Sequence, residues 1–226
     1  SDPSYKLITR MNRDMFAGTP YEHDPLGTKP SFEATTAEML KSFHDKWYVP
    51  NNATLVIAGD VDPHATLATI EKLYGSIPAR PLPAHPAVEL QPIKAESFTV
   101  PSDYPYIISI IGFRMPGSDS PDYAAATILA DVLASQRGEI YALAADGKAL
   151  SAGFQMEETY PKASVGMAYV VLPTNGNPAA LVETIQKILA DNVTHGLSPD
   201  LIAAAKRSEI ASAEFNRNSI PGLANL

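Results

Sequence analysis

The fold that we expect is decided by residues 43–62, which read Phe43-His-Asp-Lys-Trp-Tyr-Val-Pro-Asn-Asn-Ala-Thr-Leu-Val-Ile-Ala-Gly-Asp-Val-Asp62. Pro50 ends a helix because proline lacks a backbone N–H, and the two asparagines after it favour a turn. Residues 53–58 are largely apolar and of strand length, so they predict a buried strand. Asp62 is expected to cap a helix that begins at Pro63 and continues to Tyr74.

Upstream of this stretch the sequence predicts two helices separated by a loop. Residues 5–17 carry apolar side chains at helical spacing. The loop contains Pro20, Pro25, Gly27 and Pro30. Thr35-Thr36-Ala37-Glu38 then predicts a capping box, in which a hydroxyl and a glutamate three residues later satisfy free backbone donors, at the start of a helix over 37–48.

Downstream, residues 76–92 contain five prolines, which predicts a linker and a domain boundary. Beyond it the pattern alternates between strands and helices. The expected strands are 95–100, 106–114, 150–159 and 163–172, and the expected helices are 122–135, 139–146, 178–194 and 199–217. Adjacent strands with short connections, followed by runs of helices, favour an α+β fold over a doubly wound parallel sheet.

Composition excludes several classes of protein. The chain has 226 residues, of which 45% are hydrophobic and 19% are charged, as in ordinary globular domains. A formal charge of −8 disfavours nucleic-acid binding, which requires a basic face. There are no cysteines, which excludes disulfides, thiolate zinc sites and cysteine catalysis. The apolar runs are all too short to span a bilayer.

The histidines do not form a zinc motif. They are His23, His44, His64, His85 and His195, and none of them lies in His-x-x-Glu-His or His-x-x-His. His23 stands between Glu22 and Asp24, but loop residues adjacent in sequence rarely converge on one ion. His44 is expected to be a half-buried residue of its helix.

Other catalytic patterns are also missing from the sequence. It has no Gly-x-Ser-x-Gly and no Gly-rich phosphate-binding loop. Glu157 and Glu158 are neighbours on an expected strand, so their carboxylates are expected on opposite faces of a solvated strand end rather than as an acid/base pair. The sequence therefore predicts no catalytic, cofactor-binding or metal-ligating residue in this chain.

Residues 43–62 closely resemble the signature of the insulinase/pitrilysin family of inverted-zincin zinc metallopeptidases. In that signature a helix ends in an aromatic residue followed by x-Pro-x-Asn, and an apolar strand leads to Gly-Asp-x-Asp/Pro. Residues 20–27, 133–143 and 194–200 also resemble segments of the family, in the same order along the chain.

The resemblance implies an internal fragment of a longer peptidase. Residues 1–75 would be the C-terminal part of the zinc domain, 76–92 the linker, and 93–226 most of a second, metal-free domain. It also implies two similar α/β-sandwich units of metallohydrolase type, with antiparallel-rich sheets packed by helices and the first unit incomplete. The inverted zinc motif would lie before Ser1. The parent protein would then hydrolyse peptides with zinc-activated water, and this part alone would be inactive and free of zinc.

The family also carries an Arg and a Tyr on its non-catalytic half, which help to hold the substrate. Ala144 and Ser151 stand at the matching positions, and this departure favours a piece of the catalytic half or subunit. The second domain would wall the substrate chamber and offer a sheet edge to an extended peptide by strand addition.

Two other readings stay open. In the first, the chain belongs to a non-catalytic partner subunit of a processing-peptidase-like complex. In the second, it is an unrelated α+β domain with a chance Pro-Asn-Asn match. The partners implied by the resemblance are a peptide or unfolded protein substrate and a second family half or subunit, with no nucleic acid and no membrane span. The compartment is the bacterial periplasm or cytoplasm, and the habit of the family favours the periplasm.

Overall fold

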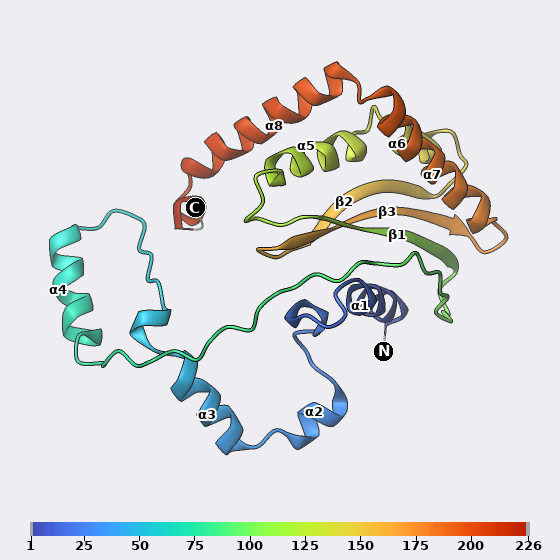
Figure 1. Ribbon diagram of the computed structural model, residues 1–226. Helices are drawn as coiled ribbons and strands as arrows, with labels where there is room; N and C mark the ends of the chain where they lie inside the picture. Colours follow the sequence, from blue (N-terminus) through green and yellow to red (C-terminus); the bar gives the residue numbers. More distant parts are fainter. Residues whose placement is uncertain (1, 225–226) are drawn as a thin grey trace. The chain divides into compact units, whose positions relative to one another are not determined.

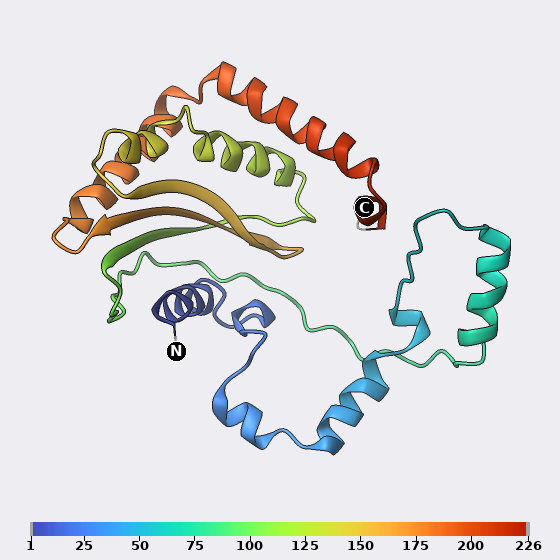
Figure 2. The same cartoon turned by 180° about the vertical axis from the view of Figure 1, so that it is seen from behind.

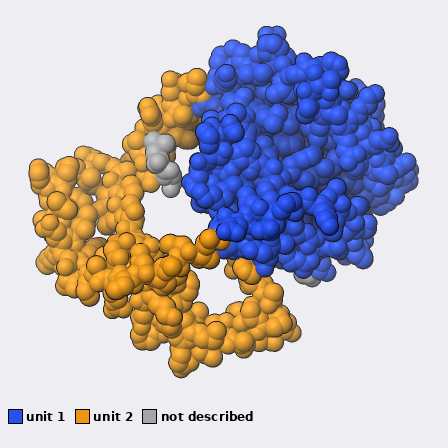
Figure 3. Space-filling view, in the orientation of Figure 1, with its two compact units in different colours: residues 1–22, 88–209 blue, residues 23–87, 210–226 orange. Residues whose placement is uncertain are grey.

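The computed structural model describes residues 2–224, except for the side chain of Glu158 (Figure 1). The chain divides into two compact units (Figure 3). The first consists of the residues up to Glu22 together with Val88–Glu209, and the second of His23–Ala87 together with the residues from Ile210 onward. Each unit is described separately below.

The first unit is built on a three-stranded antiparallel sheet. Its strands are β1 (Tyr106–Pro116), β2 (Ser151–Thr159) and β3 (Ala163–Pro173), in the order β1-β3-β2. Tyr169 in the central strand lies opposite both Ile110 and Gly153. The register of β2 shifts between Glu157 and Thr159, as in a β-bulge. These strands confirm three sequence-based predictions and the α+β class.

Three helices cover one face of this sheet, as Figures 1 and 2 both show. They are α5 (Tyr123–Ala134), α6 (Glu139–Ala145) and α7 (Pro178–His195). Side chains alternate between the two faces along a strand, so the even-numbered residues of β3 face these helices. The core on this side includes Ala168, Val170, Leu172, Ile140 and Ile185, which are at most 2% exposed. The helix α8 (Pro199–Arg217) follows α7.

The opposite face of the sheet is covered by α1 (Pro3–Met15) and the short 3-10 helix η1 (Pro20–Glu22). Phe16 is fully buried there against Val165 and Met167 of β3. Its ring makes edge contacts with Tyr21 and Tyr160, which stack on each other at 4.3 Å between centroids. The N-terminal helix is therefore an integral part of the first unit.

The second unit contains the helices α2 (Lys29–Ala34), α3 (Ala37–Trp47), α4 (Pro63–Tyr74) and α9 (Ile220–Ala224), and the 3-10 helix η2 (Pro50–Asn52). As predicted, Asp62 caps α4 by accepting a hydrogen bond from the N–H of Ala65 at 2.8 Å.

The helix α3 begins at Ala37 as predicted, but its N-cap is Thr36 rather than Thr35, and Thr36 accepts from the N–H of Met39. The reciprocal capping box lies instead at α2, between Thr28 and Ser31. The sequence predicted a loop there. Its Pro30 is compatible with helix because it occupies the first turn, where proline's missing N–H costs nothing.

Two predicted strands do not form ladders. Residues 53–58 and 95–100 lie in no strand of the structure. Strand formation needs a partner for the backbone N–H and C=O groups, and no described strand pairs with either segment. The sheet expected for the first of the two sandwich-like units is therefore not formed within residues 2–224.

Candidate functional site

The two asparagine side chains of the Pro-Asn-Asn turn form hydrogen bonds with backbone groups of other residues. Asn51 donates from Nδ2 to the carbonyl oxygen of Arg80 at 2.9 Å and accepts the N–H of Arg80 at 3.1 Å. Asn52 donates from Nδ2 to the carbonyl oxygen of Trp47 at 2.9 Å, at the end of α3. The Arg80 guanidinium donates to the carbonyl oxygen of Asp45 at 3.2 Å. The Pro-Asn-Asn motif therefore has a structural role, because its side chains fix the backbone around the turn.

The two acidic residues beside His23 accept hydrogen bonds from nearby backbone N–H groups in local turns. His23 is exposed. Glu22 accepts the N–H of Gly18 at 2.6 Å, and Asp24 accepts the N–H of Leu26 at 2.7 Å. Within residues 2–224, the structure brings together no group of three or more His, Cys, Asp or Glu side chains that could hold a metal ion.

The other histidines lie on helices or in the proline-rich segment. His44 is exposed and stacks on Tyr48 at 4.9 Å, so the expectation that it would be half-buried was wrong. The reason is that α3 has no buried residue, so its packing against other described parts of the chain is slight. The ring of His85 lies 5.2 Å from that of Trp47. His64 and His195 are exposed on α4 and α7.

The edge strand β2 presents polar side chains to solvent. Gln155 and Glu157 are exposed, and Gln155 donates from Nε2 to Glu157 at 2.6 Å. The side chain of Glu158 lies outside the described part, so the relation between the two glutamates stays a prediction. Ser151 begins this strand, and Ala144 lies on α6. Both are half-buried.

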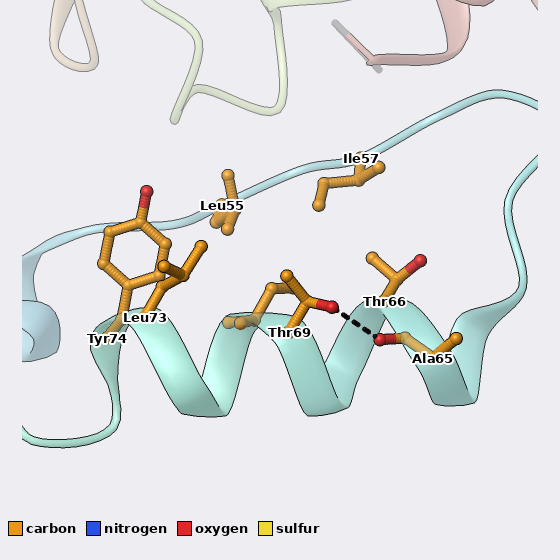
Figure 4. Close-up of a pocket in the computed structure, with 8 residues that line it drawn as sticks. Leu55, Ile57, Ala65, Thr66, Thr69, Leu73 and Tyr74 are labelled. Carbon is orange, nitrogen blue, oxygen red and sulfur yellow. Dashed lines mark hydrogen bonds between the residues drawn. The ribbon is translucent and has the colours of Figure 1, made fainter.

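A shallow apolar groove of about 400 Å³ lies inside the second unit, between the extended segment 53–58 and α4 (Figure 4). Leu55 and Ile57 point toward the helix from the extended segment, while Leu73 and Tyr74 line the other wall. The side chains of Leu55 and Ile57 are 58% and 46% exposed. Apart from the phenol of Tyr74, no residue that lines this groove carries an ionisable acid or base. The groove is therefore suited to binding apolar side chains and not to catalysis.

A half-buried cation, Arg114, holds the N-terminal helix of the first unit. Arg114 on β1 donates to the carbonyl oxygen of Met15, at the end of α1, and to that of Gln91 at 2.7 Å. Its guanidinium lies 5.6 Å from the ring centre of Phe16. Burial lowers the pKa of Arg114 from its ordinary value. The sequence analysis did not single out this arginine, although a lone basic residue inside an apolar strand was a visible signal.

Comparison with known proteins decides the family. Residues 34–209, more than half of the chain, match the family description "Peptidase M16 inactive domain". The chain belongs to the peptidase M16 family. This M16 chain is 23% identical to the zinc protease PqqE of Helicobacter pylori over 97% of its own length and 48% of that relative. It spans less than half the length of the curated relatives that it matches.

Solved structures share the fold of this M16 chain at low identity. A chain of complex III2 from Candida albicans superposes with a TM-score of 0.78 at 16% identity, over 99% of this chain and 55% of that one. The periplasmic protease PqqL from Escherichia coli superposes with a TM-score of 0.70 at 17% identity, over 99% of this chain and 26% of that one. Across residues 2–224, no helix is long and apolar enough to cross a membrane.

Proposed function

We propose that this chain is the metal-free wall of a peptide-binding chamber in a longer zinc peptidase. The observation that carries the proposal is the match of residues 34–209 to the M16 inactive domain. The likeness to a relative named as a zinc protease supports zinc in the parent protein. In this proposal residues 1–75 end the zinc domain, residues 76–92 form the linker, and residues 93–226 form the metal-free domain.

The exposed apolar groove supports the first part of this division. Leu55 and Ile57 already pack toward α4 as strand residues pack on a helix, yet the backbone of residues 53–58 joins no ladder. An extended apolar segment whose backbone groups are unpaired can accept a further strand. We infer that further strands of the parent protein pair with residues 53–58 and complete the sheet of the zinc domain.

The edge of β2 is the surface that we assign to substrate. Edge strands offer unpaired backbone groups to an added strand. Gln155, Glu157 and Thr159 of β2 are exposed, whereas β1 is half-buried along almost its whole length. An extended peptide would therefore add to β2, and Ala144 and Ser151 would stand beside it without an arginine or a tyrosine to hold it.

Hydrogen exchange tests this assignment on the chain as it exists. The chain is labelled with 15N and exchange is followed amide by amide, with and without excess unstructured casein peptide. We expect slower exchange at alternate amides of Ser151–Glu157, since adjacent residues of a strand direct their N–H groups to opposite sides. The amides of α7 serve as the control. Protection confined to helices, or no protection, would contradict the proposal.

A second function is favoured by one observation. The likeness to a chain of complex III2, in which M16-like folds take part in an assembly, supports a non-catalytic partner subunit. Peptide digestion by the full-length parent separates the two functions. Turnover that is abolished by a zinc chelator and restored by zinc supports the peptidase, and stable co-assembly with a second subunit without turnover supports the partner. The likeness to PqqL supports a periplasmic location.

A further inference from the structure

The side chain of Tyr169 leans over Gly153 of the edge strand β2. The two residues lie directly opposite each other on β3 and β2. A Cβ at Gly153 would lie 2.8 Å from the hydroxyl oxygen of Tyr169 and 2.9 Å from the ring carbon that carries it. Gly153 is buried, although β2 is an edge strand. The ring of Tyr169 therefore crosses the sheet toward β2, and its hydroxyl group lies over the edge strand.

The hydroxyl group of Tyr169 is available to a ligand. It forms no hydrogen bond with any residue that the structure describes, and it is not fully buried. A phenol both donates and accepts hydrogen bonds. Tyrosine hydroxyl groups usually have a hydrogen-bond partner when they are buried, so a ligand that covers this edge has to provide one. Ala144 and Ser151 supply no arginine or tyrosine at β2, whereas Tyr169 supplies a phenol from the central strand.

A carboxylate lies farther along the same face of β2. Glu157 is opposite Val165, which belongs to the core under α1. Side chains alternate between the two faces along a strand, so Gly153, Gln155 and Glu157 share this face. Glu157 is exposed and accepts a hydrogen bond from Nε2 of Gln155 at 2.6 Å. It forms no ion pair within the described part of the chain, so its second carboxylate oxygen is left for a ligand.

The adjoining hairpin does not neutralise this carboxylate. Lys162, in the turn that joins β2 to β3, pairs instead with Asp119 at 3.2 Å. The formal charge of the whole chain is −8, so the surroundings of Glu157 favour a cationic partner over an anionic one. Complementary charges across an interface favour the right partner and suppress the wrong one.

We propose that Tyr169 and Glu157 select the peptide that adds to β2. The peptide is an extended segment with a hydrogen-bonding side chain opposite Gly153 and a lysine or arginine opposite Glu157. This inference rests on the proposed role of β2 as the substrate edge. Opposite residues in neighbouring strands have Cβ atoms about 4.5–5.5 Å apart, so side chains of an added strand on this face meet both groups. The two peptide residues are four positions apart, whichever way the added strand runs.

Binding of short blocked peptides to the whole 15N-labelled chain tests this selection. The first probe alternates threonine and valine and carries a central serine, with a lysine four positions away on each side. Matched probes replace the lysines by glutamine, or the serine by alanine. We expect the amide signals of β2 to shift, and the lysine probe to bind about two- to five-fold more tightly than the glutamine probe, as for an exposed ion pair. Serine should be favoured over alanine by about two- to ten-fold.

Variants of the chain assign each preference to its residue. Glu157→Gln should remove the preference for lysine and keep that for serine, and Tyr169→Phe should do the reverse. Gly153→Ala should act like Tyr169→Phe, because the new Cβ displaces the end of the tyrosine side chain. The matched controls are Glu183→Gln and Tyr141→Phe, which change exposed residues on α7 and α6 and should leave both preferences intact.

The selection and the substrate edge fail in different ways. If the signals of β2 shift but Glu157→Gln and Tyr169→Phe leave both preferences unchanged, the selection is refuted while β2 remains the substrate edge. Equal affinities of the wild-type chain for all probes refute the selection without any variant having to fold. If no probe shifts the signals of β2, the substrate edge is refuted and the selection with it.

Discussion

The side-chain amide of Asn51 pairs with the backbone of Arg80 as a second strand would, by donating one hydrogen bond of 2.9 Å and accepting another of 3.1 Å. The two residues are 29 positions apart. This pair, together with the contact between Trp47 and His85, fixes part of the proline-rich segment to α3. These contacts hold Arg80 and His85 against α3 and the turn that follows it.

Replacing Asn51 by alanine is expected to release this segment. Both hydrogen bonds are lost, and each is worth about 0.5–1.5 kcal/mol when fully formed, with less expected at this exposed site. Amide exchange of Arg80 should become faster. Asn51→Asp keeps only the acceptor and should give an intermediate rate, while Asn175→Ala, in an exposed turn, should change nothing at Arg80. Equal rates in all three variants would contradict the pairing.

Two glycines of the first unit should respond differently to alanine. A Cβ at Gly117 would lie 2.2 Å from the backbone nitrogen of Ala163 and 2.4 Å from the carbonyl oxygen of Tyr160. Backbone cannot yield easily, so Gly117→Ala should cost about 1–3 kcal/mol or more. A Cβ at Gly112 would meet the sulfur of Met11 at 2.5 Å, and this flexible side chain can move. Urea unfolding of both variants checks the order, and an equal loss at Gly112 would show that α1 is packed rigidly.

Arg114→Met should loosen α1. The substitution keeps an unbranched side chain but removes the donors to the carbonyl oxygens of Met15 and Gln91. Hydrogen bonds from charged groups contribute about 1.5–3 kcal/mol. Exchange across Pro3–Met15 should become faster, while that of α7 stays unchanged. Arg114→Lys should recover only part of the protection, because an ammonium group lacks the guanidinium fork; full recovery would show that charge alone suffices.

The N-cap of α1 should give a measurable pH effect. Tyr104 donates from its hydroxyl to Asp2 at 2.6 Å, and this bond is the main cause that lowers the pKa of Asp2. A lowered pKa contributes stability above the ordinary value, which is lost as the pH falls through the lowered value. In Tyr104→Phe, NMR should show the pKa of Asp2 rising toward its ordinary value. Tyr106→Phe is the control, and a rise of the same size there would contradict this assignment.

Local patterns were sufficient for much of the first unit. Largely apolar runs of strand length at 106–114 and 163–172 predicted β1 and β3, and these runs are nearly continuous because both faces of this sheet are covered. The helices α5, α6, α7 and α8 lie within one or two residues of the predicted ranges, since each has its own start and stop signals.

Features that depend on distant residues could not be predicted. Residues 53–58 have the composition of a strand, but a ladder needs two segments, and no described strand pairs with this one. The hydrogen bonds from Arg114 to the carbonyl oxygens of Met15 and Gln91 depend on which segments cover which face of the sheet. The shift of the α3 cap from Thr35 to Thr36 reflects adjacent hydroxyls that are equally suited to capping.

The turn around Asn51 and Asn52 has a consequence for how such proteins are recognised. Both side-chain amides form hydrogen bonds with main-chain groups of Arg80 and Trp47. The two asparagines therefore serve folding of the chain and not peptide hydrolysis. A related chain without metal ligands would need the same two hydrogen-bonding side chains to fold this turn in the same way. We therefore expect residues 43–62 to mark family membership rather than hydrolytic activity.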